Sequence, residues 1–173
     1  PKHSKKWEDI YKGVEVVSAG FNTTFLIKDD GTLIGRGVNI DGQLGTRDSV
    51  SRQDWVKVMS NVIAVDSGLS FTLALKKDGS LWATGWNAFG QLGVSNRKSL
   101  NKWRKVLTNV TAIACGRSHS LALKKDGSLW VVGKNTDGQL GVGDYISKSK
   151  WQKALTHVKA IAAGNDHSLA LKK

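Results

Sequence analysis

The feature that most constrains the fold of this chain is a segment that recurs every 48 residues. Three full copies, each containing Asp-Gly and ending in Gly-Gln-Leu-Gly, occupy residues 20–45, 68–93 and 116–141. A fourth copy begins at Gly164 and continues to Lys173. A fixed period between about 20 and 50 residues is the signature of a repeat architecture. The chain is therefore expected to fold as an array of similar units.

Each repeat contains four short apolar stretches with the spacing of β-strands. In the second repeat they begin at Trp55, Val62, Phe71 and Ser80, and none shows helical periodicity. Asp-Gly at residues 78–79 separates the last two stretches. Asp-Gly between two strands predicts a hairpin in which both turn residues adopt positive φ. Four short strands per repeat, with turns between them, predict one blade of a β-propeller.

Two of the stretches indicate their places within the blade. The stretch at 62–67 ends in a small residue just before a glycine, which suggests a crowded, innermost strand. The small residues at this position of the four copies are Ala19, Ser67, Cys115 and Ala163. The stretch at 71–76 is apolar on both faces, so neighbouring sheets are expected to cover both of them.

A motif built around glycine and histidine occurs in the third and fourth copies. Residues 113–123 read Ile-Ala-Cys-Gly-Arg-Ser-His-Ser-Leu-Ala-Leu, and residues 161–171 repeat this pattern. Together with Asp-Gly-Ser-Leu-Trp, Gly-x-Asn and Gly-Gln-Leu-Gly, it resembles the pattern of the regulator of chromosome condensation repeat family. The resemblance covers nearly the whole chain. It implies an all-β fold, a seven-bladed β-propeller that binds other proteins and has no shared catalytic centre.

The chain departs from the family pattern in three ways. The histidine of the motif is replaced by Thr23 and Phe71 in the first two copies. Where the family often has proline, the repeats carry Trp55, Trp103 and Trp151. The chain holds about three and a half repeats, whereas the family propellers have seven blades.

These repeats predict a single partial β-propeller domain over residues 1–173. The predicted repeats are at about 7–54, 55–102 and 103–150, with an incomplete one at 151–173. Counting strands, including one that begins at Trp7, gives 15 in the chain, and two copies would supply about 30, close to the 28 or 32 of seven or eight blades. Because an open ring exposes sheet edges, we predict a homodimer in which a second copy completes the ring. The alternative is half of a longer protein that needs its other half.

Candidate catalytic and metal-binding residues are few. Cys115 is the only cysteine, which excludes an intrachain disulfide and a cysteine-based metal cluster. His119 and His167 stand at the same repeat position, each followed by serine, and hydrogen bonding between blades explains them better than a nucleophile–base pair. His3 and His157 lack the spacing of metal ligands. We therefore expect no catalytic residue, metal or cofactor, and hence a protein that is not an enzyme.

Targeting signals are not evident in the sequence. The longest apolar runs are strand-like and far shorter than the ~18 residues that a membrane-spanning helix needs. The residues from Pro1 to Lys6 have no apolar region behind them, so no signal peptide is expected. Membrane contact is therefore not predicted, and the compartment is left open.

Apolar residues that break the repeat are the best candidates for partner binding, because residues shared by all repeats are explained by the blade. The second copy has Trp86 where the others have Val38 and Lys134. Exposed aromatic side chains in loops commonly anchor protein partners, although some could instead cover the interface between blades. The predicted apolar contact residues are Phe21, Leu69, Phe71, Trp86, Phe89 and Tyr145.

The formal net charge of +12 favours acidic partners. Residues 94–102 carry three basic residues and no acidic one, whereas their counterpart at 46–54 is neutral. The predicted basic contact residues are Arg97, Lys98 and Lys102, with Lys2, Lys5 and Lys6 at the N-terminus. Phosphate contacts require little beyond positive charge, so nucleic-acid binding is retained as an alternative.

The first functional hypothesis is a non-catalytic, protein-binding scaffold that recognises a partner with one rim of the propeller. The resemblance also implies guanine-nucleotide exchange on a small GTPase, but repeats of equal length leave no room for an inserted loop. Chromatin or nucleic-acid binding through the basic segments is a further alternative. The last is a fragment, or an artificially selected repeat protein, without a ligand of its own, because copies two and three are identical at 18 of 27 positions over residues 67–93 and 115–141.

Overall fold

The computed structural model of the chain describes residues 9–173. Within these residues it forms fourteen β-strands and no helix, so no helix there could cross a membrane. This all-β architecture confirms the predicted fold class. The predicted strand at Trp7 and the basic residues Lys2, Lys5 and Lys6 lie outside the described residues.

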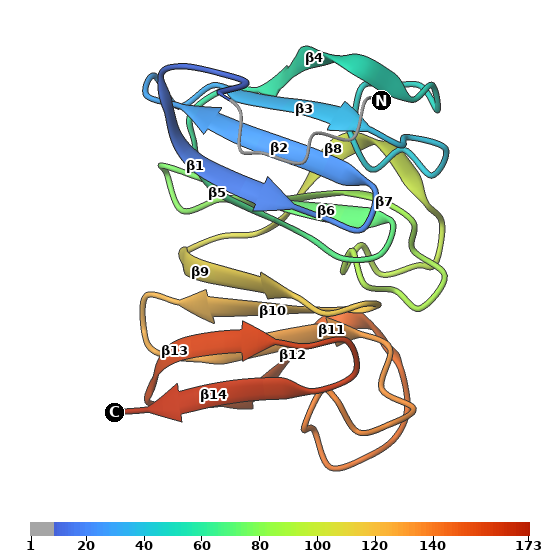
Figure 1. The fold of residues 1–173 in the computed structure, drawn as a ribbon. Helices are drawn as coiled ribbons and strands as arrows, with labels where there is room; N and C mark the ends of the chain where they lie inside the picture. Colours follow the sequence, from blue (N-terminus) through green and yellow to red (C-terminus); the bar gives the residue numbers. More distant parts are fainter. Residues whose placement is uncertain (1–8) are drawn as a thin grey trace.

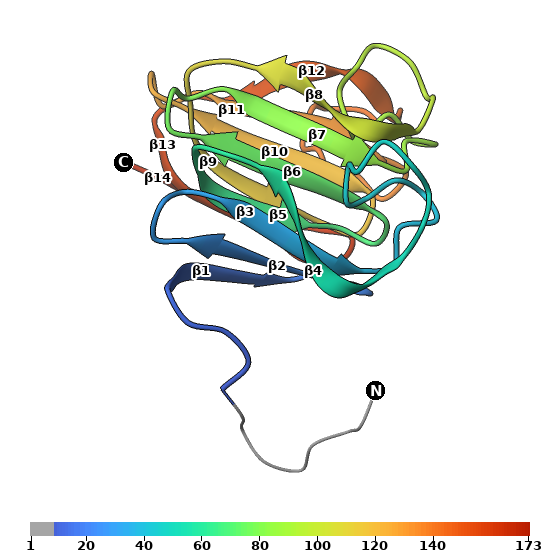
Figure 2. The same ribbon diagram turned by 90° about the horizontal axis from the view of Figure 1, so that it is seen from above.

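The strands form three four-stranded antiparallel sheets, called blades 1 to 3, and one two-stranded sheet, called half-blade 4. Blade 1 contains β1 (Val14–Ala19), β2 (Thr23–Lys28), β3 (Leu33–Gly37) and β4 (Arg52–Met59). Blade 2 contains β5 (Val62–Ser67), β6 (Phe71–Lys76), β7 (Leu81–Gly85) and β8 (Leu100–Leu107). Blade 3 contains β9 (Val110–Cys115), β10 (His119–Lys124), β11 (Leu129–Gly133) and β12 (Lys148–Leu155), and half-blade 4 contains β13 (Val158–Ala163) and β14 (Ser168–Lys172). The blades follow one another as an open partial ring (Figures 1 and 2).

Each blade combines residues of two successive sequence repeats. The strand that carries the repeated tryptophan does not begin a sheet: β4, with Trp55, pairs with β3 as the outermost strand of blade 1. The strand order within every complete blade runs from inner to outer strand along the chain. The blades therefore begin at β1, β5 and β9. Each of these strands starts several residues after the tryptophan at which the predicted repeat begins.

The innermost strands are those predicted from their small residues. β1, β5, β9 and β13 contact one another in succession, which places the small ends of these strands at the axis of the array. The second strands are buried on both faces in blades 2 and 3, as predicted for the stretch at 71–76. Apolar cores fill the spaces between blades, with residues from both neighbours.

The Asp-Gly hairpins differ from the prediction that both turn residues have positive φ. In the turn between β6 and β7, Gly79 has a φ of 78°, whereas Asp78 is not among the residues with positive φ. The Asp78 carboxylate instead accepts a hydrogen bond from the backbone N–H of Ser80 at 2.9 Å. A three-residue hairpin loop with glycine in the left-handed position explains this geometry. The aspartate is present because it caps the turn through its side chain.

Candidate functional site

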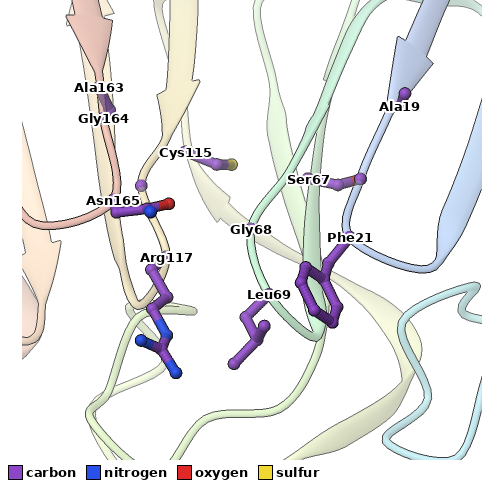
Figure 3. Close-up of a pocket in the computed structure, with 12 residues that line it drawn as sticks. Ala19, Phe21, Ser67, Gly68, Leu69, Cys115, Arg117, Ala163, Gly164 and Asn165 are labelled. Carbon is purple, nitrogen blue, oxygen red and sulfur yellow. The ribbon is translucent and has the colours of Figure 1, made fainter.

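A hollow of about 430 Å³ opens at the axis of the array, between the turns that follow the four innermost strands (Figure 3). Each turn begins at a glycine whose N–H donates to the carbonyl of the residue three positions later, as in Gly68 to Phe71 at 2.9 Å and Gly116 to His119 at 2.9 Å. This hollow is called the axial hollow below. Its position at the ends of the innermost strands of blades 1 to 3 and half-blade 4 makes it the candidate functional site.

Backbone contacts between blades hold the turns around the axial hollow. The N–H of Leu69 donates to the carbonyl of Arg117 at 3.1 Å, and the N–H of Arg117 donates to the carbonyl of Asn165 at 3.0 Å. A Cβ at Gly116 would lie 2.7 Å from the carbonyl oxygen of Gly164, closer than real Cβ atoms approach. A Cβ at Gly68 would likewise lie 2.7 Å from the carbonyl oxygen of Gly116, so only glycine permits the close approach of the turns of blade 2, blade 3 and half-blade 4. At Gly20 of blade 1, a Cβ would instead meet the side chains of Thr23 and Ser67.

The residue after each glycine differs from blade to blade and projects at the rim of the axial hollow. Phe21 is 71% exposed, and Leu69 is half-buried beside it. Arg117 and Asn165 follow on the next two turns and are exposed. Figure 3 shows Phe21, Leu69 and Arg117 pointing in the same direction from successive turns. The rim therefore has an apolar half and a polar, cationic half.

A half-buried carboxylate, Asp66, lies on β5 near the axial hollow. It accepts hydrogen bonds from the N–H of Cys115 at 2.7 Å and from the N–H of Ser67 at 2.9 Å. Burial raises the pKa of Asp66 above its usual value. Asp66 was not predicted as a site residue, although an acid near the end of a strand that otherwise ends in small residues is a visible departure from the repeat.

The Cys115 thiol is not an activated nucleophile. Burial, and next the nearby charge of Asp66, raise the pKa of the thiol well above its ordinary value. Since the thiolate is the reactive form of cysteine, this thiol stays protonated near neutral pH. The described residues also contain no group of three or more His, Cys, Asp or Glu side chains that could hold a metal ion.

His119 links two blades, as predicted. Its Nε2 lies 3.0 Å from Oγ of Ser168 on β14, and the Ser168 hydroxyl donates to the carbonyl of Gln139 at 2.7 Å. Because the Ser168 hydroxyl proton is directed to the carbonyl of Gln139, the Ser168 oxygen can only accept from His119. His119 therefore carries a proton on Nε2 and donates it to Ser168. Burial lowers the pKa of His119 to about 4, so the imidazole is neutral near pH 7. The residue has a structural role between blades.

Phe71 was wrongly predicted as a contact residue. Its side chain is 1% exposed and belongs to the core of blades 2 and 3. The ring lies over Gly68 in the position that His119 takes over Gly116. The substitution of histidine by phenylalanine therefore fills an interblade site with apolar atoms and does not create a surface.

The remaining predicted aromatic residues lie away from the lining of the axial hollow. Trp86 and Phe89 are partly buried and pack edge-to-face on each other, with ring centroids 5.5 Å apart. Tyr145 is 72% exposed in the loop before β12. Of the six predicted apolar contact residues, only Phe21 and Leu69 are brought together in the hollow.

The predicted basic residues form a separate, exposed group. Arg97 and Lys98 lie in the loop before β8, and Lys102 lies on β8 itself. None of the three forms an ion pair with another residue in the described part of the chain. β8 carries two further exposed cations, Arg104 and Lys105, and no acidic residue.

Comparison with known proteins gives matches to repeat families and to solved structures. The regulator of chromosome condensation (RCC1) repeat model matches residues 78–123 and 126–171, and a second model of the same repeat matches residues 62–91 and 110–139. No curated protein sequence matches the chain.

Three solved structures illustrate the fold. Prp20p of Saccharomyces cerevisiae, studied for its binding to Gsp1p and histones, is 18% identical with a TM-score of 0.83, over 91% of this chain and 43% of that one. Yeast RCC1 (Prp20) bound to Kap60 is 25% identical with a TM-score of 0.80, over 95% and 43%. Human WBSCR16 is 22% identical with a TM-score of 0.58, over 95% and 59%. The chain thus spans less than half the length of either Prp20 chain.

Proposed function

The chain belongs to the regulator of chromosome condensation (RCC1) repeat family, and we propose that it is a non-catalytic scaffold whose axial hollow binds an extended segment of a partner protein. One observation carries this proposal: four turns with the same backbone scaffold present four different side chains around one hollow. Prp20, whose structure resembles this chain, has been studied with the protein partners Gsp1p, histones and Kap60.

The chemistry of the rim indicates the kind of segment that would bind. Phe21 and Leu69 offer adjacent apolar surface, and an exposed aromatic side chain is a frequent anchor at protein interfaces. Arg117 can form charge-assisted hydrogen bonds with a carboxylate. A segment in which an apolar residue is followed by an acidic residue would satisfy both halves of the rim.

A non-catalytic role is supported by the protonation and burial of the side chains near the axial hollow and by the equal lengths of the loops. The thiol of Cys115 is held protonated, and His119 is buried between blades. The loops between the third and outer strands, at 38–51, 86–99 and 134–147, have the same length in all three blades, so none carries an insertion. Nothing in these loops favours nucleotide exchange over simple binding.

Rim substitutions are expected to remove partner binding without unfolding the protein. Peptides selected from a random display library on the wild-type chain should contain an apolar–acidic pattern. The Phe21→Ser/Leu69→Ser double variant and the Arg117→Glu variant should each bind them at least about tenfold more weakly, the loss expected when an interface anchor is removed. Tyr145→Ser is the matched control, because Tyr145 is equally exposed outside the hollow. Equal binding by all variants would reject the axial hollow as the site.

A second candidate function, nucleic-acid binding, is favoured by the exposed cations beside and on β8, which form no ion pair within residues 9–173. If Arg97, Lys98 and Lys102 each contact one phosphate, affinity for a DNA duplex should fall about 40-fold between 50 and 200 mM salt. Replacing the three residues with glutamine should abolish most of this salt dependence. Fluorescence anisotropy with a labelled duplex measures both effects, and an affinity that barely changes with salt would exclude phosphate contacts.

We further propose that a second copy can complete the ring, as the strand count predicts. A two-fold axis along the axis of the ring requires an even number of blades, so the 30 predicted strands of two copies would form six blades of four strands and two blades of three strands. Multi-angle light scattering should then give twice the 18.8-kDa mass of one chain. A chain that remains a monomer at tens of micromolar and unfolds cooperatively would contradict this proposal.

A further inference from the structure

One buried side-chain amide between blades 2 and 3 lacks a hydrogen-bond acceptor. Gln91 is fully buried, and its Nε2 has no hydrogen-bond partner among the described residues. The orientation of this amide is fixed, because its Oε1 accepts a hydrogen bond from the N–H of Phe89 at 3.1 Å. The unpaired group is therefore the donor. Native proteins leave few buried donors unpaired, because each one is costly.

The junction between blade 3 and half-blade 4 indicates which acceptor fits this position. Gln139, the counterpart of Gln91, has the same orientation, with Oε1 accepting from the N–H of Asp137 at 3.0 Å. Its Nε2 lies 3.5 Å from Oδ1 of Asp166, which is on the turn before β14. The same carboxylate oxygen accepts from the Lys134 ammonium at 3.1 Å. A carboxylate thus lies in front of the glutamine amide at this junction.

The junction of blades 2 and 3 has lost this carboxylate by substitution. Three positions differ between the junctions: Ser118 stands in place of Asp166, Trp86 in place of Lys134, and Phe89 in place of Asp137. No hydrogen bond joins Ser118 to the Gln91 amide in the described part of the chain. The junction therefore keeps the donor without the acceptor.

The blades dock in the same way at both junctions. The hydroxyls of Ser120 and Ser168 donate to the carbonyls of Gln91 and Gln139, at 2.8 and 2.7 Å. A Cβ at Gly133 would lie 3.0 Å from Cβ of Gln91, so Gln91 is held closely against blade 3. The two junctions therefore differ in their side chains and not in how one blade meets the next.

The charges around the unpaired amide favour an acid supplied by another molecule. Arg117 adjoins Ser118 in the chain, is exposed, and belongs to the rim of the axial hollow. The loop at 86–99 contains the exposed residues Arg97 and Lys98 and no acidic residue. A carboxylate entering this junction would thus meet cations and a buried N–H donor, and no acid from the loop would repel it.

We propose that the junction of blades 2 and 3 binds the carboxylate of an acidic side chain in the partner segment, in the position that Asp166 fills one junction later. The carboxylate accepts hydrogen bonds from Nε2 of Gln91 and from the Arg117 guanidinium. This proposal rests on the proposed binding of a segment at the axial hollow and adds the place of its acidic residue. The N–H of Leu69 donates to the carbonyl of Arg117, so one short segment can reach both turns.

The carboxylate reaches the amide past an aromatic pair. Trp86 holds the repeat position of Lys134, whose ammonium contacts Asp166. Trp86 and Phe89 are only partly buried and contact each other edge-to-face. Rotation of the Trp86 side chain toward solvent admits the carboxylate and leaves the backbone of the loop in place.

Peptides selected on the wild-type chain, which need Phe21 and Leu69 for binding, are the probes. Each is compared by fluorescence anisotropy with a counterpart in which asparagine or glutamine replaces the acid. The wild-type protein should bind the acidic peptide at least tenfold more tightly, because hydrogen bonds to a carboxylate are charge-assisted. Gln91→Glu keeps the acceptor for the Phe89 N–H but replaces the donor with a carboxylate oxygen. This variant should bind the amide peptide more tightly than the acidic one.

Gln43→Glu is the matched control, because Gln43 accepts from the N–H of Asp41 at the same repeat position of blade 1. It should keep the tenfold preference for the acidic peptide. A variant that only loosens the junction would weaken both peptides equally, whereas the proposal requires the preference to reverse in Gln91→Glu. The same preference in Gln91→Glu as in the wild type, or no preference in the wild type, would overturn it. Peptides that bind the Phe21→Ser/Leu69→Ser variant normally would instead reject the axial hollow.

Ser118→Asp tests the position without a peptide. The new carboxylate takes the place that Asp166 has at the next junction, so the side-chain NH₂ signals of Gln91 in a ¹⁵N NMR spectrum should move toward those of Gln139. Ser70→Asp adds the same charge one junction earlier and should leave the Gln91 signals in place. Unmoved Gln91 signals in Ser118→Asp would overturn the proposal, whatever the axial hollow binds.

Discussion

Replacing Gly93 with alanine is expected to lower the free energy of unfolding by about 2–4 kcal/mol, whereas the same change at Gly141 should cost only about 1 kcal/mol. Both glycines have positive φ, at 69° and 60°, so the backbone strain introduced by a Cβ is similar at the two positions. At Gly93, however, the new Cβ would overlap the indole of Trp151, which is buried against blade 2. The larger loss therefore measures the displacement of this tryptophan.

Urea unfolding of the two variants, followed by circular dichroism, measures the difference directly. Since Gly141 has no described atom within 4 Å of its Cβ position, it serves as the internal control for φ strain. Trp151→Ala should produce a loss similar to that of Gly93→Ala, and the double variant should lose little more than either single variant. Equal losses at Gly93 and Gly141 would contradict the packing of the outer-strand tryptophan on the preceding blade.

Acidification from pH 7 to pH 5 is expected to destabilise the protein by about 2 kcal/mol through His119 alone. Burial lowers the pKa of His119 in the folded chain to about 4 from an ordinary value of 6.5. Between these values the unfolded chain binds the proton and the folded chain does not. Stability from this residue is therefore complete above pH 6.5 and is lost as the pH falls toward 4.

His119→Phe should remove this part of the pH dependence, because Phe71 already fills the equivalent site of blade 2. The measurement is the free energy of unfolding in urea at pH 7, 6 and 5. His167→Phe is the matched control, since His167 holds the same repeat position but is exposed. Carboxylates with lowered pKa, such as Asp48 at about 2, titrate below this window. An unchanged slope in His119→Phe would assign the pH dependence to other groups.

Much of the fold could be predicted from the sequence because the information is repeated. The 48-residue period, the small residues before each glycine and the doubly apolar stretch at 71–76 indicated stacked blades with an innermost strand. The assignment of the tryptophan strand to the preceding blade could not be read in this way. A periodic sequence has no intrinsic starting point, and only the hydrogen bonds between β3 and β4 determine where a sheet begins.

The candidate site was predicted less completely. Phe21 and Leu69 were found because they break the repeat on the loops after the inner strands, and both line the axial hollow. The same reasoning failed for Phe71, because a residue can break the pattern while it stays in the core. Asp66 was missed because its partner, the N–H of Cys115, belongs to the next blade, 49 residues away.

The sharing of each blade between two successive repeats has a consequence for how such proteins change length. Deleting or duplicating 48 consecutive residues inside the array joins a strand to the same strand of another repeat, so blades 1 to 3 change in number while each remaining blade keeps four strands. Recombination between misaligned gene copies can therefore add or remove whole blades without a defined breakpoint. Propellers with different numbers of blades become accessible from one ancestral array.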